Sequence, residues 1–311
     1  MRILVTGGAG FIGSNIVDAY VSAGHEVHIL DNFSTGREIN VNADAVLHRA
    51  DIRDREAVDA LFKANAFDLV NHHAAQLDVR VSVRDPQFDA AQNVIGSLNL
   101  LQSAVESGTR RFVFASTGGA VYGEQESFPA DEEHPTNPIS PYGVTKLAVE
   151  KYLHCFRHIH GIDYVVCRYT NVYGPRQNPH GESGVIAIFC DMMHRGEQPT
   201  INGDGTQTRD YVFVGDVVAA HMSVLDHLQR KGDGTFNICT NTETSVNELF
   251  GTLNNVFGNV FEHRYGPPMP GEQLRSVCSY GRAQNVLGWS PKVDLKSGLE
   301  RTVEHHRNES R

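Results

Sequence analysis

Hydrophobic runs alternate with longer, more polar segments along the first half of the chain. Six short runs rich in β-branched and apolar residues predict strands at 2–7, 26–31, 45–51, 68–75, 111–117 and 164–172. The segments between them predict helices at about 12–22, 53–64, 87–107 and 141–160. Strands that are apolar at almost every position are buried on both faces. The alternation therefore predicts an α/β fold, a doubly wound parallel sheet covered by helices on both sides.

This regular pattern loosens after residue 174. Residues 174–184 have loop composition and 185–195 predict a helix, while 209–240 predict a strand, a helix and a strand that return to the sheet. Ser245 and Glu248 have the spacing of a capping box, which predicts a helix start, and a polar helix is expected near 296–308. We expect two parts: a main domain of residues 1–174 plus about 210–240, and a smaller C-terminal lobe of about 175–209 and 241–311.

Composition and charge narrow the class of partner. The 311 residues carry a formal net charge of −10, which argues against nucleic acid or an anionic membrane as the main partner. No apolar run approaches the roughly 18 residues of a membrane span, and the N-terminus reaches glycines too early for a secretory signal. The five cysteines are scattered and lack metal-ligand spacing, so we expect reduced thiols in a cytoplasmic protein and no metal site.

A glycine loop follows the first predicted strand. The stretch "LVTGGAGFIG" places Gly7, Gly10 and Gly13 between that strand and a helix, which is the arrangement that brings bare backbone close to a pyrophosphate. Asp31 ends the second strand about 18 residues later, where a carboxylate binds a ribose 2′-hydroxyl and repels a 2′-phosphate. The pattern favours NAD over NADP. Asp51, at the end of the third strand, is a candidate contact for the adenine.

A tyrosine and a lysine stand four residues apart at the start of a predicted helix. In "SPYGVTK", Ser140 is a candidate N-cap and Pro141 the first helical residue, so Tyr142 and Lys146 share one helical face. A free tyrosine has a pKa of about 10 and is a poor base at neutral pH. A nearby ammonium and a positively charged nicotinamide both favour the phenolate, which makes Tyr142 a candidate acid–base group.

Together these motifs resemble those of the extended short-chain dehydrogenase/reductase family, and within it the nucleotide-sugar epimerases such as UDP-galactose (UDP-glucose) 4-epimerase. The resemblance runs nearly end to end. It includes "VTGGAGFIGSNIV", "LDNFSTG", "HHAAQLDVRVSVRDP", "NVIGSLNLL", "STGGAVYGE", "RYTNVYGPRQ", "INGDGTQTRDYVFVGDV" and "PGEQLRS".

The resemblance implies a set of site residues. The acid–base residue would be Tyr142, assisted by Lys146 and by a hydroxyl from Thr117 or Ser116. Residues implied to bind NAD are Gly7, Gly10, Phe11, Ile12, Gly13, Asp31, Asn32, Asp51, Ile52, Ala74, Ala75, Gln76, Asn93, Tyr142 and Lys146. Residues implied to bind the nucleotide-sugar are Thr117, Tyr142, Asn171, Val185, Arg209 and Glu272.

The implied activity is NAD-dependent 4-epimerisation of a UDP-hexose, UDP-glucose or UDP-galactose, through a transient 4-keto sugar. Alternatives are a 4-epimerase for UDP-N-acetylglucosamine or UDP-glucuronate and an NAD(P)-dependent 4-keto-sugar reductase. A dinucleotide-binding regulatory module without catalysis is disfavoured because Tyr142 and Lys146 are both present. A homodimer is implied through the helices near 87–107 and 141–160, on which Val94, Leu98, Leu101, Val105, Val149 and Leu153 either pair across the dimer or cover the sheet.

The stretch "ASTGGAVYG" at 115–123 departs from the family pattern in an informative way. Dehydrating and decarboxylating relatives carry acidic residues just before "VYG", whereas this chain has Gly119 and Ala120, which cannot transfer a proton. The position of the usual hydroxyl falls on Gly118, so the role passes to Thr117 or Ser116, and we expect Thr117.

A second departure lies in the loop "PPMPGEQLRS". Met269 stands where many relatives have an arginine that grips the diphosphate, and Arg275 is a candidate replacement. Ser276, a small residue at the position that gates sugar size, leaves room for a 2-acetamido group.

Overall fold

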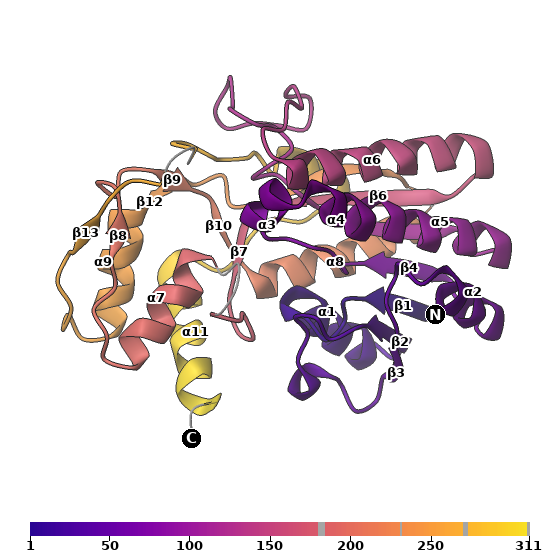
Figure 1. Ribbon diagram of the computed structural model, residues 1–311, viewed down its shortest axis with the longest axis horizontal. Coiled ribbons are helices and arrows are strands. Elements are labelled where there is room, and N and C mark those ends of the chain that lie inside the picture. Colours follow the sequence, from indigo (N-terminus) through magenta and orange to yellow (C-terminus); the bar gives the residue numbers. More distant parts are fainter. Residues whose placement is uncertain (180–183, 231, 270–272, 310–311) are drawn as a thin grey trace.

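The structure is a computed structural model that describes residues 1–179, 184–230, 232–269 and 273–309. In Figure 1 a large sheet with its helices lies to the right, and a smaller C-terminal lobe around α7, α9 and α11 lies to the left. Among the described residues, none of the helices combines the length and the apolar character needed to cross a membrane.

Seven parallel strands form the central sheet. They are β1 (Arg2–Thr6), β2 (Glu26–Asp31), β3 (Val46–Arg49), β4 (Leu69–His72), β5 (Arg111–Thr117), β6 (Asp163–Tyr169) and β11 (Gly234–Ile238). Their spatial order is β11-β6-β5-β4-β1-β2-β3, and every neighbouring pair runs parallel. The order reverses between β1 and β4, and ligands of such sheets bind at the carboxyl ends of the strands beside this reversal.

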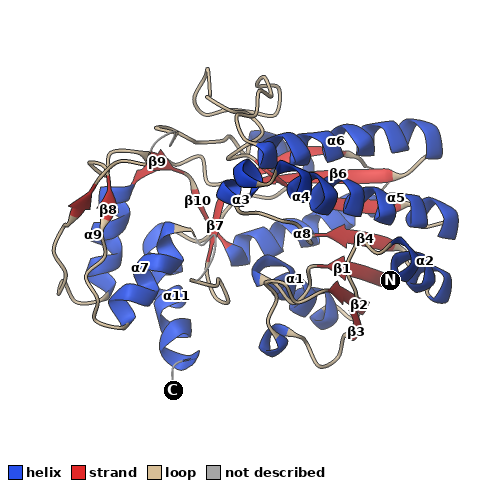
Figure 2. Cartoon of the chain, in the orientation of Figure 1, coloured by secondary structure: helices blue, strands red, loops and turns tan. Residues whose placement is uncertain are grey.

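Helices cover both faces of this sheet, as Figure 2 shows. They are α1 (Phe11–Ser22), α2 (Arg55–Ala64), α3 (Val79–Arg84), α4 (Pro86–Ala90), a π-helix (Ala91–Ile95), α5 (Gly96–Ser107), α6 (Pro141–His160) and α8 (Val214–Gln229). Ile3 and Val5 pack in one core with α1 and α8, whereas Leu4 packs in a second core with α2, α5 and α6. Because successive strand residues face opposite sides, both faces of β1 are apolar and buried.

The C-terminal lobe is assembled from separated pieces of the chain. Its elements are β7 (Asn171–Tyr173), α7 (Val185–His194), β8 (Ile201–Asn202), β9 (Thr208–Arg209), β10 (Tyr211–Phe213), β12 (Thr244–Ser245), α9 (Val246–Val256), β13 (Tyr265–Gly266) and α11 (Leu295–Glu309). The strands pair two by two, β10 with β7, β12 with β9 and β13 with β8. A third core, which includes Phe189, Phe250 and Leu299, holds α7, α9 and α11 together. The capping box of Ser245 and Glu248 is present at the start of α9.

Tertiary pairing changes several predicted elements. The strand expected at 164–172 is divided into β6 and β7, because β7 leaves the sheet to pair with β10. For the same reason β10 does not return to the large sheet, and only β11 does. The helix expected at 87–107 contains a π-helical turn, and α3 and α10 (Gly281–Leu287) were not predicted. The start of α3 has a sequence signal, the N-cap Asp78.

Candidate active site

The glycine loop leaves bare backbone at the start of α1. Gly7 has a φ of 69°, and a Cβ atom on it would lie 2.7 Å from the backbone nitrogen of Ala74. A Cβ on Gly13 would collide with the carbonyl group of Gly7, and one on Gly10 would lie 3.1 Å from the same carbonyl oxygen. The loop can therefore pack against the segment after β4 and against α1 only with glycine at positions 7 and 13. The N-terminal N–H groups of α1 are a favourable position for phosphate.

The two residues that open α1 are packed rather than exposed. Phe11 contacts the core of the C-terminal lobe, and Ile12 contacts the core of α1 and α8. The glycine loop is in this way tied to both parts of the molecule.

Asp31 lies against the glycine loop. Its carboxylate accepts hydrogen bonds from the backbone N–H of Ala9 (3.0 Å) and of Phe33 (2.8 Å). Since Ala9 belongs to the glycine loop, this bond places the Asp31 carboxylate beside the loop and the start of α1. This is where an acidic residue meets the ribose of a dinucleotide.

The ends of β2 and β3 are joined by polar side chains. The residues concerned are Asn32, after β2, and Asp51, which follows β3 and precedes Ile52. The Asn32 side-chain amide donates to the Asp51 carboxylate at 2.9 Å, and Arg53 forms an ion pair with the same carboxylate at 2.8 Å. The hydrogen bond from Arg53 is the main cause that lowers the pKa of Asp51 to about 2, so Asp51 is anionic at neutral pH. The Ile52 side chain is buried in the core, and its carbonyl oxygen accepts a hydrogen bond from Asn99.

The loop that follows β4 is fastened on two sides. The Ala74 N–H donates to the Thr6 hydroxyl at 3.2 Å, which ties the loop to β1, and Ala75 follows half-buried. Gln76 donates its N–H to the Asn93 side-chain oxygen at 2.8 Å, and the Asn93 amide donates back to the Gln76 carbonyl at 2.9 Å. Asn93 lies in the π-helix, a distortion that is often found at functional sites.

Lys146 and Tyr142 meet beside the end of β5. Ser140 caps α6 by accepting the Gly143 N–H at 3.1 Å, as the sequence predicts. The Lys146 ammonium donates to the Ala115 carbonyl at 3.0 Å and lies 5.8 Å from the centre of the Tyr142 ring. Burial lowers the pKa of Lys146 to about 8, against the opposing influence of Asp89 and Glu150.

Ser116 and Thr117 have different surroundings. The Ser116 hydroxyl is buried and donates to the Glu150 carboxylate at 2.5 Å, and Glu150 in turn pairs with Arg168 at 2.6 Å. Thr117 is the next residue of β5, faces the opposite side of the strand and is half-buried. Ser116 is thus part of a buried structural network, which favours Thr117 as the hydroxyl available to a ligand.

Gly118 is enclosed by a segment from the far end of the chain. A Cβ on Gly118 would lie 3.1 Å from the Cys278 sulfur and 3.5 Å from the carbonyl oxygens of Arg168 and Tyr169. A hydroxyl-bearing side chain therefore meets a filled space at this position. At Gly119 the nearest atom to an added Cβ is the Thr117 hydroxyl oxygen, at 3.8 Å, so this position is open.

The pairing of β7 with β10 brings Asn171 and Arg209 into one region. Asn171 is paired with Tyr211, and its N–H donates to the Asp210 carbonyl at 2.9 Å. Arg209, the last residue of β9, precedes Asp210, and its guanidinium donates to the Thr208 carbonyl at 2.8 Å. Val185, the first residue of α7, packs against the core of the lobe. Glu272 lies outside the described residues.

Arg275, the candidate replacement for an arginine at Met269, is engaged by two neighbouring side chains. Its guanidinium pairs with Glu243 at 2.7 Å and stacks over the Phe128 ring, 3.9 Å from the ring centre. Ser276 is 2% exposed and is therefore enclosed in the fold. Met269 is exposed and lies at the edge of a cavity.

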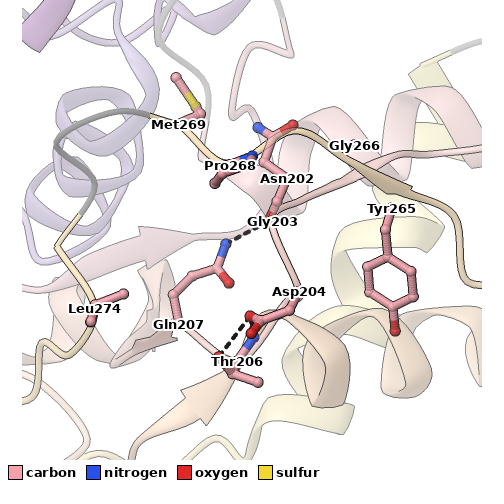
Figure 3. A pocket seen from close by; sticks show the side chains of 10 residues that line it. All are labelled: Asn202, Gly203, Asp204, Thr206, Gln207, Tyr265, Gly266, Pro268, Met269 and Leu274. Carbon is pink, nitrogen blue, oxygen red and sulfur yellow. Dashed lines mark hydrogen bonds between the residues drawn. The ribbon is translucent and has the colours of Figure 1, made fainter.

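This cavity has a volume of about 710 Å³ and lies in the C-terminal lobe (Figure 3). Its lining residues are Asn202, Gly203, Asp204, Thr206, Gln207, Tyr265, Gly266, Pro268, Met269 and Leu274. Gln207 donates to the Asn202 carbonyl at 3.0 Å and so holds the loop after β8 in a closed turn. Because Gln207 is two residues from Arg209, the cavity is close along the chain to the candidate diphosphate contact.

Asp89 is a buried polar residue near Lys146 that was not among the residues predicted from the sequence. Asp89 is fully buried and accepts hydrogen bonds from Gln76 (2.8 Å), Asn93 (3.1 Å) and Thr145 (2.7 Å). One signal was available: Asp89 precedes Asn93 by four residues on a predicted helix, so the two share a face.

Comparison with known proteins decides the family. The model of the NAD dependent epimerase/dehydratase family matches residues 3–239. The chain belongs to this family. This chain is 43% identical over 315 residues to a UDP-glucose 4-epimerase of Mycolicibacterium smegmatis, and the alignment covers 100% of both chains.

Solved structures agree closely with this fold. A UDP-glucose 4-epimerase of Thermotoga maritima, solved with UDP-glucose, is 46% identical with a TM-score of 0.97 over all of both chains. A UDP-glucose 4-epimerase of Thermus thermophilus, solved with NAD, is 42% identical with a TM-score of 0.93 over 99% of both chains. The predicted family, the doubly wound (Rossmann) fold and the NAD-dependent enzyme class are confirmed.

Proposed function

We propose that the protein is an NAD-dependent 4-epimerase of UDP-hexoses that interconverts UDP-glucose and UDP-galactose. The observation that carries the proposal is the meeting of Tyr142 and Lys146 beside the end of β5, next to two positions, Gly119 and Ala120, that carry no proton-transfer group. Epimerisation at C4 needs one acid–base group and a hydride acceptor. Elimination or decarboxylation needs a further acid or base near C5 or C6. The names of the similar proteins support the same activity.

NAD fits the residues that surround the glycine loop. The loop is closed to side chains at Gly7 and Gly13, and Asp31 faces it from the end of β2. We propose that the loop and α1 hold the pyrophosphate, that Asp31 and Asn32 hold the adenosine ribose, and that the segment 74–76 with Lys146 lies along the nicotinamide half. Bound there, NAD would supply the hydride acceptor and donor that reaction at C4 of the sugar needs.

Tyr142 carries the proton of the reacting hydroxyl. As phenolate it accepts the proton of the 4-hydroxyl, and as phenol it returns that proton when the 4-keto group is reduced. The Lys146 ammonium stabilises the phenolate, and its hydrogen bond to Ala115 fixes its position. We assign to Thr117 a hydrogen bond to the reacting oxygen. Such positioning holds the sugar in the geometry that the reaction needs.

The nucleotide part of the substrate lies on the C-terminal lobe. Arg209 supplies a cation for the diphosphate, with Asn171, Val185 and Glu272 as further contacts. We propose that the residues 1–174 with about 210–240 bind the cofactor and that the remaining C-terminal residues bind the nucleotide-sugar. Phe11, at the start of α1, packs against the core of the C-terminal lobe and so joins the proposed cofactor-binding and substrate-binding parts.

A substrate panel tests the activity. UDP-glucose, UDP-galactose, their N-acetyl counterparts and UDP-glucuronate are incubated singly with the enzyme, and the products are separated by chromatography. We expect interconversion of UDP-glucose and UDP-galactose. Turnover confined to the N-acetyl or uronic forms would assign the alternative 4-epimerases. A reductase would instead consume NAD(P)H stoichiometrically, which absorbance of the cofactor during turnover reveals.

We further propose a cytoplasmic homodimer that pairs through α5 and α6. Leu101, Val149 and Leu153 are fully buried within the chain, so these side chains cover the sheet and are not available to a partner. Ile95 (52% exposed) and Ile159 (63% exposed) present apolar surface on the same helical segments. Light scattering of the purified protein measures the assembly, and a monomeric mass at micromolar concentration would contradict the dimer.

The cysteines support the proposed cytoplasmic location. All five are free thiols, the state that a reducing compartment maintains.

A further inference from the structure

The Lys146 ammonium is buried between α6 and β5. Its side chain is 4% exposed, donates to the Ala115 carbonyl and lies 4.9 Å from the centre of the Phe114 ring. A buried ammonium is costly unless a negative charge balances it. Two buried carboxylates lie near it. Asp89 accepts a hydrogen bond at 2.7 Å from Thr145, the residue before Lys146, and Glu150 lies one turn further along α6. Both favour the charged form of Lys146 and so oppose the lowering of its pKa by burial.

Glu150 already has a cation of its own. Its carboxylate accepts hydrogen bonds from the Arg168 guanidinium at 2.6 Å and 3.0 Å, and both side chains are 6% exposed. The Ser116 hydroxyl donates a third hydrogen bond to the same carboxylate. The negative charge of Glu150 is therefore matched within this pair.

Asp89 is held by neutral groups instead. It is 0% exposed, and the side chains that donate to it belong to Gln76, Asn93 and Thr145. Thr145 immediately precedes Lys146 on α6, and its bond to Asp89 joins α4 to the helix that carries the acid–base pair. The Asp89 carboxylate is thus held by two amides and a hydroxyl. The nearby Lys146 ammonium is held by a backbone carbonyl.

We propose that Asp89 is a positioning residue for the reaction, whose buried carboxylate balances the charge of the Lys146 ammonium and thereby maintains the Tyr142 phenolate. The inference rests on the proposed function, because it concerns the acid–base pair of that reaction. Asp89 itself does not touch the reacting atoms. It acts through Lys146.

The other groups that face Lys146 do not replace this charge. At the end of β4, burial lowers the pKa of His72 to about 3, and it lowers the pKa of the following residue, His73, well below its ordinary value. Both are therefore neutral at physiological pH. Arg168 on β6 is matched by Glu150. On α3 and at the start of α4, Arg80, Arg84 and Asp85 are exposed, and Arg80 pairs with Asp78. Solvent screens these surface charges.

Asp89→Asn removes the charge with little change of shape. Without the carboxylate, Lys146 loses its proton more readily, and the pair then carries a neutral phenol and a neutral amine. We expect the alkaline limb of the pH–kcat profile to move to lower pH by about one unit and kcat at pH 7 to fall about tenfold, with KM little changed. Asp89→Ser is a second neutral variant should the first fail to fold.

Two matched variants separate charge from hydrogen bonding. Thr145→Val removes the hydroxyl donor and keeps the carboxylate, so we expect the alkaline limb to stay in place. Asp59→Asn removes a carboxylate on α2 that pairs with Arg55, and we expect an unchanged profile. An unmoved limb in Asp89→Asn, or an equal shift in Thr145→Val, overturns the proposal.

A stability cycle tests the same coupling without any turnover. Urea unfolding is measured for the wild type, Asp89→Asn, Lys146→Met and the double variant. We expect the double variant to lose less stability than the sum of the single losses, by a factor of roughly ten in the unfolding equilibrium constant. Strictly additive losses overturn the proposal. The two proposals can fail separately. If the cycle shows coupling but the protein epimerises no nucleotide-sugar, the charge balance stands and only the proposed function is refuted.

Discussion

The sulfur of Cys278 lies 3.1 Å from the position that a Cβ atom on Gly118 would occupy. The two residues are 160 positions apart, and the contact is reinforced by the Cys278 thiol, which points at the Gly118 carbonyl oxygen at 3.7 Å. A thiol from the C-terminal segment thus fills the space beside the strand end where relatives carry a hydroxyl. A side chain at Gly118 would crowd this thiol, which supports our proposal that Thr117 supplies the hydroxyl at the reacting oxygen.

Gly118→Ser should destabilise the protein by about 1–3 kcal/mol, because the new side chain overpacks against Cys278. The backbone conformation of Gly118 is not left-handed, so the cost comes from space alone. Cys278→Ala opens room, and we expect the double variant to be more stable than the sum of the single losses predicts. Urea unfolding measures each variant. Gly119→Ser, at the adjacent open position, is the matched control and should cost much less.

Thr117→Val should lower kcat about tenfold to a hundredfold, whereas Ser116→Ala should keep most of the turnover. The reason is that the Ser116 hydroxyl is already bonded to Glu150 within a buried network. Removing it costs about 1 kcal/mol of stability instead. Steady-state kinetics and unfolding are measured on both variants. Equal, mild kinetic losses at the two positions would eliminate a catalytic hydroxyl on β5.

Tyr142→Phe should reduce turnover by about 10²–10⁴-fold while NAD stays bound, since only the acid–base hydroxyl is lost. Kinetics with UDP-galactose and the NAD content of the purified protein provide the two readouts. Tyr152→Phe, an exposed tyrosine on the same helix, is the control and should behave as wild type. Near-normal turnover in Tyr142→Phe would remove Tyr142 from the mechanism.

Asp51→Asn should reduce stability by about 1–2 kcal/mol at neutral pH. The pKa of Asp51 is lowered from 3.8 to about 2, chiefly by Arg53, so the folded state holds its proton less tightly than the unfolded state. The stabilisation is therefore complete above about pH 4 and is lost as the pH falls toward 2. Urea unfolding at several pH values should show the gap between wild type and variant closing on acidification. Asp44→Asn, at an exposed position, should show no such closing gap.

Local signals in the sequence predicted much of the fold. Inner strands of the sheet such as β1 and β5 are apolar on both faces, and α6 carries its own start signals, Ser140 and Pro141. These signals depend on neighbours within a few residues, so a single sequence contains them. The division of 164–172 into β6 and β7 escaped prediction, because it depends on pairing with β10 forty residues later.

The candidate site divides in the same way. The sequence alone determined the glycine loop, Asp31 and the Tyr142–Lys146 spacing, because each is a local pattern with a direct chemical meaning. Tertiary structure decided that Ser116 is bonded to Glu150, that Cys278 fills the space beside Gly118, and that Asp89 is bonded to Thr145 next to Lys146. Each of these relations joins residues that are far apart in the chain. Only the packed sheet brings them within hydrogen-bonding or van der Waals distance, and burial there gives each charge and each hydroxyl its role.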